Sequence, residues 1–163
     1  MTDTTISKSS FFHISATLLF LILFVYANTL NSPLNFDDHA VIQQLKNSTN
    51  QVKKNHTPIG MPIDTYRQII PLQHRHLFYL SFSINHMQGG TNPFGYHLIN
   101  ISFHYLTSLV LFFIVFFTLK NGADLNRKQA FNIAGLTAIL FSISPLNTET
   151  VTYISGRASG MAG

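Results

Sequence analysis

The side chains best suited to do chemistry in this chain are a few charged residues near long apolar runs. Asp37 and Asp38 are adjacent, Glu149 is the only glutamate, and Arg157 lies in the last apolar stretch. A carboxylate can act as a general base or bind a divalent cation, and an arginine can bind an anion. Because neighbouring side chains diverge by about 100° on a helix, both aspartates cannot face one reacting atom. We therefore expect one aspartate to act directly and the other to support it.

Each of these residues also has a purely structural interpretation. Asp38 can cap a helix that begins near His39, because its side chain can accept an early backbone N–H group. Glu149 can be a solvated charge near the start of the next helix. An unpaired Arg157 in lipid would cost about 2.5 to 3.5 kcal/mol, so it should pair with a phosphate or a carboxylate, or extend to the membrane surface.

The eight histidines do not form a zinc motif. His74, His76 and His86 lack the HExxH pattern, and no carboxylate lies between them. The sequence has no cysteine, which excludes thiolate zinc sites, disulfides and cysteine nucleophiles. A divalent cation such as Mg²⁺ or Mn²⁺, held by Asp38 and Glu149, stays open as a cofactor.

The composition indicates a membrane protein. Of 163 residues, 46% are hydrophobic and only 10% are charged. Soluble domains carry about a quarter charged residues. The net charge of +4 comes from ten basic and six acidic residues, which are too few to form a nucleic-acid-binding patch. The expected partner is therefore the lipid bilayer, and no nucleic acid is expected.

Three apolar segments predict transmembrane helices. Residues 11–28 reach the lower limit of about 17 residues for a spanning helix. Residues 96–119 supply about 24 uncharged residues, enough for about 36 Å of helix across a hydrocarbon core of about 30 Å. Residues 129–145 are shorter and contain Gly135, so they suit either a third span or a buried helix.

The distribution of basic residues predicts the orientation of these helices. The connection 120–128 is short and basic, so the positive-inside rule places it in the cytoplasm. The N-terminal residues 1–10 then also lie in the cytoplasm. The long loop 29–95 and the final segment 146–163 lie on the outer, lumenal or periplasmic side.

The outer loop is expected to contain short helices at the membrane interface. The mixed apolar pattern that follows Arg75 fits such a helix, on which Arg75 could bind phosphate or simply face water. His97 and Asn100, at the head of the second span, share one helix face. They can hydrogen-bond to the outer loop or to another helix.

Both ends of the chain leave alternatives. Lys8 before the first apolar segment, with Val25 and Ala27 near the end of that segment, also fits a cleaved signal peptide. Apolar residues return after Pro145, and the sequence stops at Gly163 without a polar tail. We therefore expect a fragment of a longer protein.

Three ordered stretches resemble one known family. They are Asn35-Phe-Asp-Asp-His, Asn92-Pro-Phe-Gly-Tyr-His-Leu-Ile-Asn, and Leu140-Phe-Ser-Ile-Ser-Pro-Leu-Asn-Thr-Glu-Thr-Val with Ile154-Ser-Gly-Arg-Ala. Over residues 16–163 the chain resembles the N-terminal membrane region of the transmembrane and tetratricopeptide-repeat O-mannosyltransferases and their bacterial relatives. One departure is Ser144, which stands before Pro145 where the family usually has histidine.

The resemblance implies an all-α, polytopic membrane enzyme of the GT-C type, with about three transmembrane helices in this part. Such an enzyme moves a sugar, here expected to be mannose or a similar sugar, from a polyprenyl- or dolichyl-phosphate carrier. The acceptor is a hydroxyl of a protein or glycan on the outer side of the membrane. The implied location is the bacterial inner membrane or the endoplasmic reticulum.

The resemblance also implies roles for individual residues. Asp37 is the candidate base and Asp38 its neighbour. Candidates for contacting the donor phosphate or the acceptor are Glu149, Arg157, Arg75 and His97. Because the family continues through many more spans, these residues alone are expected to be inactive. The alternatives are a non-catalytic membrane anchor or scaffold of a tetratricopeptide-repeat protein and, with a poorer fit to the polar outer loop, a small transporter subunit.

Overall fold

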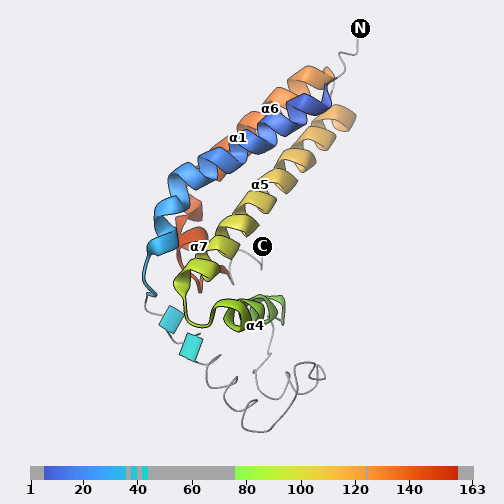
Figure 1. Cartoon of the computed structure of the whole chain (residues 1–163). Coiled ribbons are helices and arrows are strands. Elements are labelled where there is room, and N and C mark those ends of the chain that lie inside the picture. Colours follow the sequence, from blue (N-terminus) through green and yellow to red (C-terminus); the bar gives the residue numbers. More distant parts are fainter. Residues whose placement is uncertain (1–5, 36–37, 40–41, 44–75, 124, 158–163) are drawn as a thin grey trace.

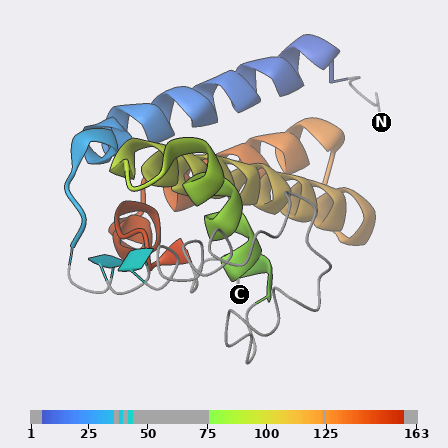
Figure 2. The same ribbon diagram turned by 60° about the horizontal axis from the view of Figure 1, so that its bottom comes forward.

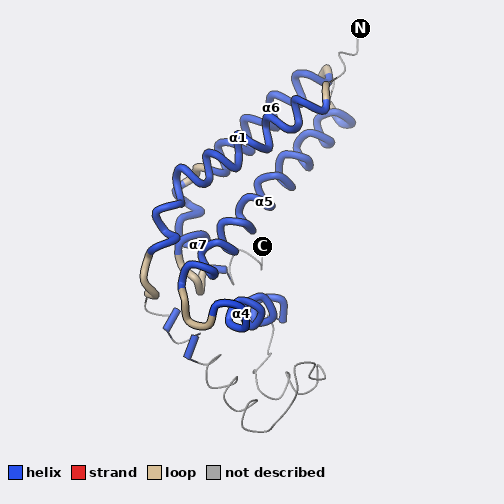
Figure 3. The backbone as a smooth tube through the Cα atoms, viewed as in Figure 1, coloured by secondary structure: helices blue, strands red, loops and turns tan. Residues whose placement is uncertain are grey.

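The computed structural model describes residues 6–35, 38–39, 42–43, 76–123 and 125–157. Within these ranges all regular secondary structure is helical (Figure 3), which confirms the expected all-α class. The helices are α1 (Lys8–Tyr26), the 3-10 helix η1 (Ala27–Asn31), α4 (His76–Gly89), α5 (Pro93–Gly122), α6 (Arg127–Ser142), the 3-10 helix η2 (Pro145–Asn147) and α7 (Thr148–Thr152). Asp37 and Arg75, two of the candidate site residues, lie outside the described residues.

Two helical stretches are long and apolar enough to cross a membrane. They are Lys8–Asn31, of 24 residues, and α5, of 30 residues. A third crossing results if α6 and the following segment Pro145–Thr152, which are bent by 50° at their junction, form one broken span. The described part of the chain therefore has two to three candidate spans by length and composition, as expected.

The three long helices begin earlier than their apolar runs. They start at Lys8, Pro93 and Arg127, against expected starts at 11, 96 and 129. Side chains that accept early backbone N–H groups fix these starts, namely Ser7 before α1, Asn92 before α5 and Asn126 in a capping box before α6. A glycine or a charge, such as Gly95 or Lys128, interrupts an apolar run without ending a helix, so the helices extend beyond the apolar segments.

Helices α1, α5 and α6 lie side by side and alternate in direction (Figure 1). Their shared core includes Phe112 and Phe116 from α5 and three alanines on one face of α6. Small residues let α6 approach closely, since a Cβ added to Gly135 would lie only 3.3 Å from Cδ1 of Ile14 on α1. The bundle is therefore held by an aromatic surface of α5 packed on a small-residue surface of α6.

Large apolar side chains point outward from all three helices. Phe24 is 79% exposed, and Leu106 and Leu136 are more than half exposed. Helices that are apolar on their outer face as well as in the core suit a lipid environment. The phenylalanine run of α5 serves both purposes, because Phe112 and Phe116 are buried whereas Phe113 and Phe117 are exposed.

Helix α4 lies across one end of this bundle (Figure 2). A tight turn that includes Gly90, with φ of 60°, connects it to α5. Phe82 of α4 packs on Tyr96 of α5, with 5.6 Å between ring centroids. The helix expected after Arg75 is therefore present. Its position at a membrane interface stays a prediction.

Candidate functional site

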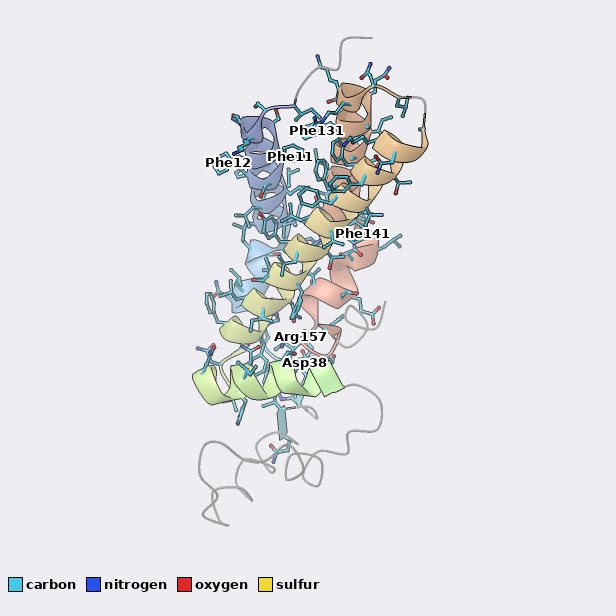
Figure 4. The ribbon with its side chains drawn as sticks, turned by 90° about the vertical axis from the view of Figure 1, so that its right-hand side faces the viewer. Phe11, Phe12, Asp38, Phe131, Phe141 and Arg157 are labelled. Carbon is cyan, nitrogen blue, oxygen red and sulfur yellow. The ribbon has the colours of Figure 1, made fainter. Side chains whose placement is uncertain are left out.

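Buried polar side chains gather at the end of the bundle that α4 covers. Five of them, each at most 4% exposed, are Asp38, Asn85, His97, Asn100 and Arg157. Figure 4 places Asp38 and Arg157 beside α4, at the opposite end from Phe11 and Phe131. Because a buried polar group needs a partner, the hydrogen bonds of these residues show how the site is built.

Arg157 is the centre of this cluster. Its Nε donates to Oδ1 of Asn100 at 2.7 Å, and one terminal nitrogen donates to the backbone oxygen of Tyr96 at 2.8 Å. The other terminal nitrogen donates to Oδ1 of Asn85 at 3.1 Å and to Oγ of Ser81 at 3.2 Å. The guanidinium thus joins the first turns of α5 to α4.

The charge of Arg157 is not neutralised by any described side chain. All of its described hydrogen-bond acceptors are neutral oxygens, and its guanidinium carbon lies 4.3 Å from the centroid of the Phe82 ring. Burial lowers the pKa of Arg157 to about 10, an effect that Tyr96 partly offsets, so the guanidinium is still protonated at neutral pH. The sequence led us to expect a phosphate or carboxylate partner, or a position at the membrane surface. Among the described residues the guanidinium has only neutral acceptors, so its positive charge could attract an anion.

Asp38 ties together two distant parts of the chain. Its Oδ1 accepts the backbone N–H of Ser155 at 2.7 Å, and its Oδ2 accepts that of Asn35 at 3.2 Å. Each carboxylate oxygen therefore accepts a charge-assisted hydrogen bond from a backbone N–H group. This arrangement fixes the turn before Arg157 against the segment that follows α1.

His97 contributes a buried acceptor. Its Nε2 lies 3.3 Å from the backbone oxygen of Ser32 and must carry the proton of that hydrogen bond. Its Nδ1 is buried without a hydrogen-bond partner among the described residues. His97 thus reaches the loop that follows α1, which is one of the two contacts that the sequence allowed, and its Nδ1 can accept a hydrogen bond from a hydroxyl group or water.

Glu149 lies at the same end of the bundle, in the first turn of α7, and is exposed. The chain turns back sharply after α7, so that a Cβ added to Gly156 would overlap the backbone oxygen of Glu149. Asn100 holds this turn, because its Nδ2 donates to the backbone oxygen of Tyr153 at 2.9 Å. The turn thereby brings Arg157 into the buried cluster and leaves the Glu149 side chain outside it.

The described residues do not enclose a metal ion. No group of three or more His, Asp or Glu side chains within the described ranges could hold one. The carboxylates among them are Asp38, which is tied to two backbone donors, and Glu149. Mg²⁺ is commonly bound by one or two carboxylates, with water and substrate phosphate as its other ligands. Among the described residues only a site of this kind, with few protein ligands, is possible.

Several residues of the cluster were not expected from the sequence. Asn85, Ser81 and the backbone oxygen of Tyr96 all bind Arg157, and Gly156 permits the turn. Asn85 is one of several polar residues between Ser81 and Gln88, so its position in the sequence does not distinguish it. Nothing in the sequence signals the roles of Ser81 or of a backbone oxygen.

Protein O-mannosyl-transferases of animals are similar to this chain in sequence. Human protein O-mannosyl-transferase TMTC1 is 39% identical over 89 residues, which are 55% of this chain and 9% of the human protein. Mouse TMTC2 is 32% identical over 143 residues, which are 83% of this chain and 15% of the mouse protein. The Xenopus laevis tmtc2 protein is 30% identical over 150 residues, covering 86% of this chain and 16% of that protein.

The chain therefore spans at most 16% of the length of these three relatives. No family model matches it, and no solved structure matches it.

Proposed function

Because this multi-pass membrane chain is homologous to the TMTC protein O-mannosyl-transferases, we propose that it is part of a glycosyltransferase. The donor is a mannose, or a similar sugar, linked to a polyprenyl or dolichyl phosphate. The acceptor is a hydroxyl group of a protein, and the reaction takes place at the outer surface of the membrane.

The positive charge of Arg157, which no described side chain neutralises, is the observation that carries this proposal. The guanidinium is buried at one end of a bundle of spanning length, with neutral partners among the described residues. The phosphate of a lipid-linked sugar also lies where the hydrocarbon ends. A cation held in a poorly hydrated site favours the negative charge that develops on a leaving phosphate. Arg157 is therefore the residue we assign to the donor phosphate, with Arg75 as a second candidate on sequence grounds.

The hydrogen bonds of Asp38 support a division of roles between the two aspartates. Both oxygens of Asp38 are engaged by backbone donors, which suits a positioning residue. The base that takes the proton of the acceptor hydroxyl is then Asp37, as the family resemblance implies. His97, with its available Nδ1, is assigned to a hydrogen bond with a donor or acceptor hydroxyl.

Glu149 is assigned to the acceptor, or would help to hold a divalent cation near the donor phosphate. It is exposed and belongs to α7, which lies near the α4 end of the bundle (Figure 1), and this position suits both roles. Such a cation would stabilise negative charge on the phosphate when bound. Removal of divalent cations with EDTA should then stop the transfer, and Mn²⁺ or Mg²⁺ should restore it. Glu149→Gln should raise the cation concentration needed for half-maximal activity.

The direct test uses Asp37→Asn in the complete protein, with Asp64→Asn as the matched control. Membranes that contain each variant are supplied with radiolabelled dolichyl-phosphate mannose, and mannose transferred to membrane protein is measured. Loss of a general base predicts a fall of at least about 100-fold for Asp37→Asn and native transfer for Asp64→Asn.

Native transfer by Asp37→Asn at normal expression would remove this residue from the role of base. If the unaltered protein also transfers no sugar but still associates with its partners, the chain is the membrane anchor of a scaffold protein instead.

A further inference from the structure

The end of the bundle opposite Asp38 and Arg157 is basic. Its cations are Lys8 at the start of α1, Lys120 in the last turn of α5, and Arg127 and Lys128 at the start of α6. The described carboxylates, Asp38 and Glu149, lie at the other end. We call these four cations the basic end.

The three helices meet in one aromatic cluster at this end. The ring of Phe11 lies 5.2 Å from that of Phe131 and 5.8 Å from that of Phe116, edge to face in both cases. These residues belong to α1, α6 and α5 respectively. The cluster therefore fixes the relative positions of the helix ends that carry the cations (Figure 4).

Each cation lies about one helical turn beyond a ring of this cluster. Lys8 precedes Phe11 by one turn, Lys128 precedes Phe131 in the same way, and Lys120 follows Phe116 by one turn. Residues three or four positions apart lie on the same side of a helix. The cations of three different helices therefore converge above one small area.

Arg127 gives an independent indication of a ligand. Its side chain is half buried, and its Nε is buried without a hydrogen-bond partner among the described residues. A buried donor that lacks an acceptor costs about 1–3 kcal/mol, so such groups are usually paired. An oxygen of a bound anion would satisfy it.

The surroundings favour an anionic lipid over a free anion. Phe117, 50% exposed, lies one turn before Lys120 on α5, and Phe113 below it is 42% exposed. These exposed phenylalanines lie next to the cations of the basic end. In one anionic lipid the acyl chains could contact the phenylalanines while the phosphate contacts the cations. The neighbouring sequence also contains Asp3 and Asp124, which leave the four cations in excess.

We propose that the basic end binds the phosphate headgroup of an anionic phospholipid, with the acyl chains along the exposed phenylalanines of α5. The inference does not depend on the glycosyltransferase proposal, because it involves the opposite end of the bundle. It also gives a physical reason for this end to face the more anionic, cytoplasmic leaflet.

The test measures binding of fluorescently labelled phosphatidylglycerol and phosphatidylcholine to the purified full chain in neutral detergent micelles. We expect the chain to bind phosphatidylglycerol more tightly, and high salt to remove that preference. Each cation near the membrane surface should contribute about fivefold to the affinity. The triple variant Lys120→Gln, Arg127→Gln, Lys128→Gln should therefore lower the affinity for phosphatidylglycerol by about 100-fold.

A second triple variant, Lys46→Gln, Lys53→Gln, Lys54→Gln, removes the same charge elsewhere and should keep the native affinity. Equal losses in the two triple variants would mean that only net charge matters, and would overturn the proposal. If inorganic phosphate competed as effectively as unlabelled phosphatidylglycerol, the ligand of the basic end would be a free anion, and the lipid proposal would be wrong.

Circular dichroism shows whether the basic-end triple variant folds. If it does not fold, two further measurements still test the proposal. In the native chain, affinity for phosphatidylglycerol that does not change with salt would refute the inference. The charge-preserving variant Lys120→Arg, Lys128→Arg should bind within about twofold of the native chain, and a loss as large as that of the triple variant would also refute it.

Discussion

Replacing Arg157 with methionine should strongly destabilise the bundle, because the guanidinium supplies hydrogen bonds to α4 and α5 at once. The change would leave the side-chain oxygens of Asn85 and Asn100 and the backbone oxygen of Tyr96 buried without this donor. Each such loss costs about 1–3 kcal/mol, so three of them set a minimum of about 3 kcal/mol. Methionine keeps part of the packing volume, which limits the expected loss to about 3–5 kcal/mol.

The free energy of unfolding can be measured by steric trapping of the protein in lipid bicelles, with Leu136→Met as a control that changes an exposed side chain. The control should change stability by less than about 0.5 kcal/mol. A double-mutant cycle of Arg157→Met with Asn100→Leu should give a coupling of about 1.5–3 kcal/mol, the range for a hydrogen bond to a charged group. A loss below about 1 kcal/mol for Arg157→Met would refute the central structural role of Arg157.

Three further changes can be measured in the same unfolding assay. Gly156→Ala should cost about 1–3 kcal/mol, because its Cβ would overlap the backbone oxygen of Glu149, whereas Gly122→Ala meets nothing within 4 Å and should be nearly neutral; equal effects would contradict the tight turn. Asp38→Asn should cost about 1.5–3 kcal/mol, because an amide has one acceptor oxygen for two backbone donors, and an unchanged stability would show that these two bonds contribute little. Ala134→Leu should cost about 1–3 kcal/mol in the packed core of α6, and a neutral result would mean that α6 can move away from its neighbours.

The sequence predicted the helices better than their ends. An uncharged run locates a spanning helix because lipid excludes charge, and α1 and α5 were found in this way. The same criterion stopped short of Lys8 and Gly122, because caps and backbone hydrogen bonds continue a helix into water. The phenylalanines of α5 divide between the core and the outer surface, and only the packing of α5 on α1 and α6 decides which of them are buried.

The sequence could single out two residues of the buried cluster, but not their contacts. Asp38 and Arg157 were marked by their charge beside apolar segments. Their partners, Ser155 for Asp38 and Asn85 for Arg157, lie far from them in sequence, and no local pattern encodes such contacts. For Arg157 the sequence allowed a charged partner or the membrane surface. The described contacts are neutral oxygens, and several of them can serve a buried guanidinium geometrically as well as one carboxylate does.

The hydrogen bonds of Asp38 determine how mutations at the acidic pair must be interpreted. Because Asp38 holds the turn before Arg157, Asp38→Asn would disturb the proposed phosphate contact even if this carboxylate never touches a substrate. Lost transfer in that variant would therefore not identify a base. The two roles separate only when transfer and stability are measured together: a base at Asp37 predicts lost transfer at native stability, whereas the anchor at Asp38 predicts that both fall. If Asp38→Asn lost transfer at native stability and Asp37→Asn lost neither, the assignment of the two aspartates would have to be reversed.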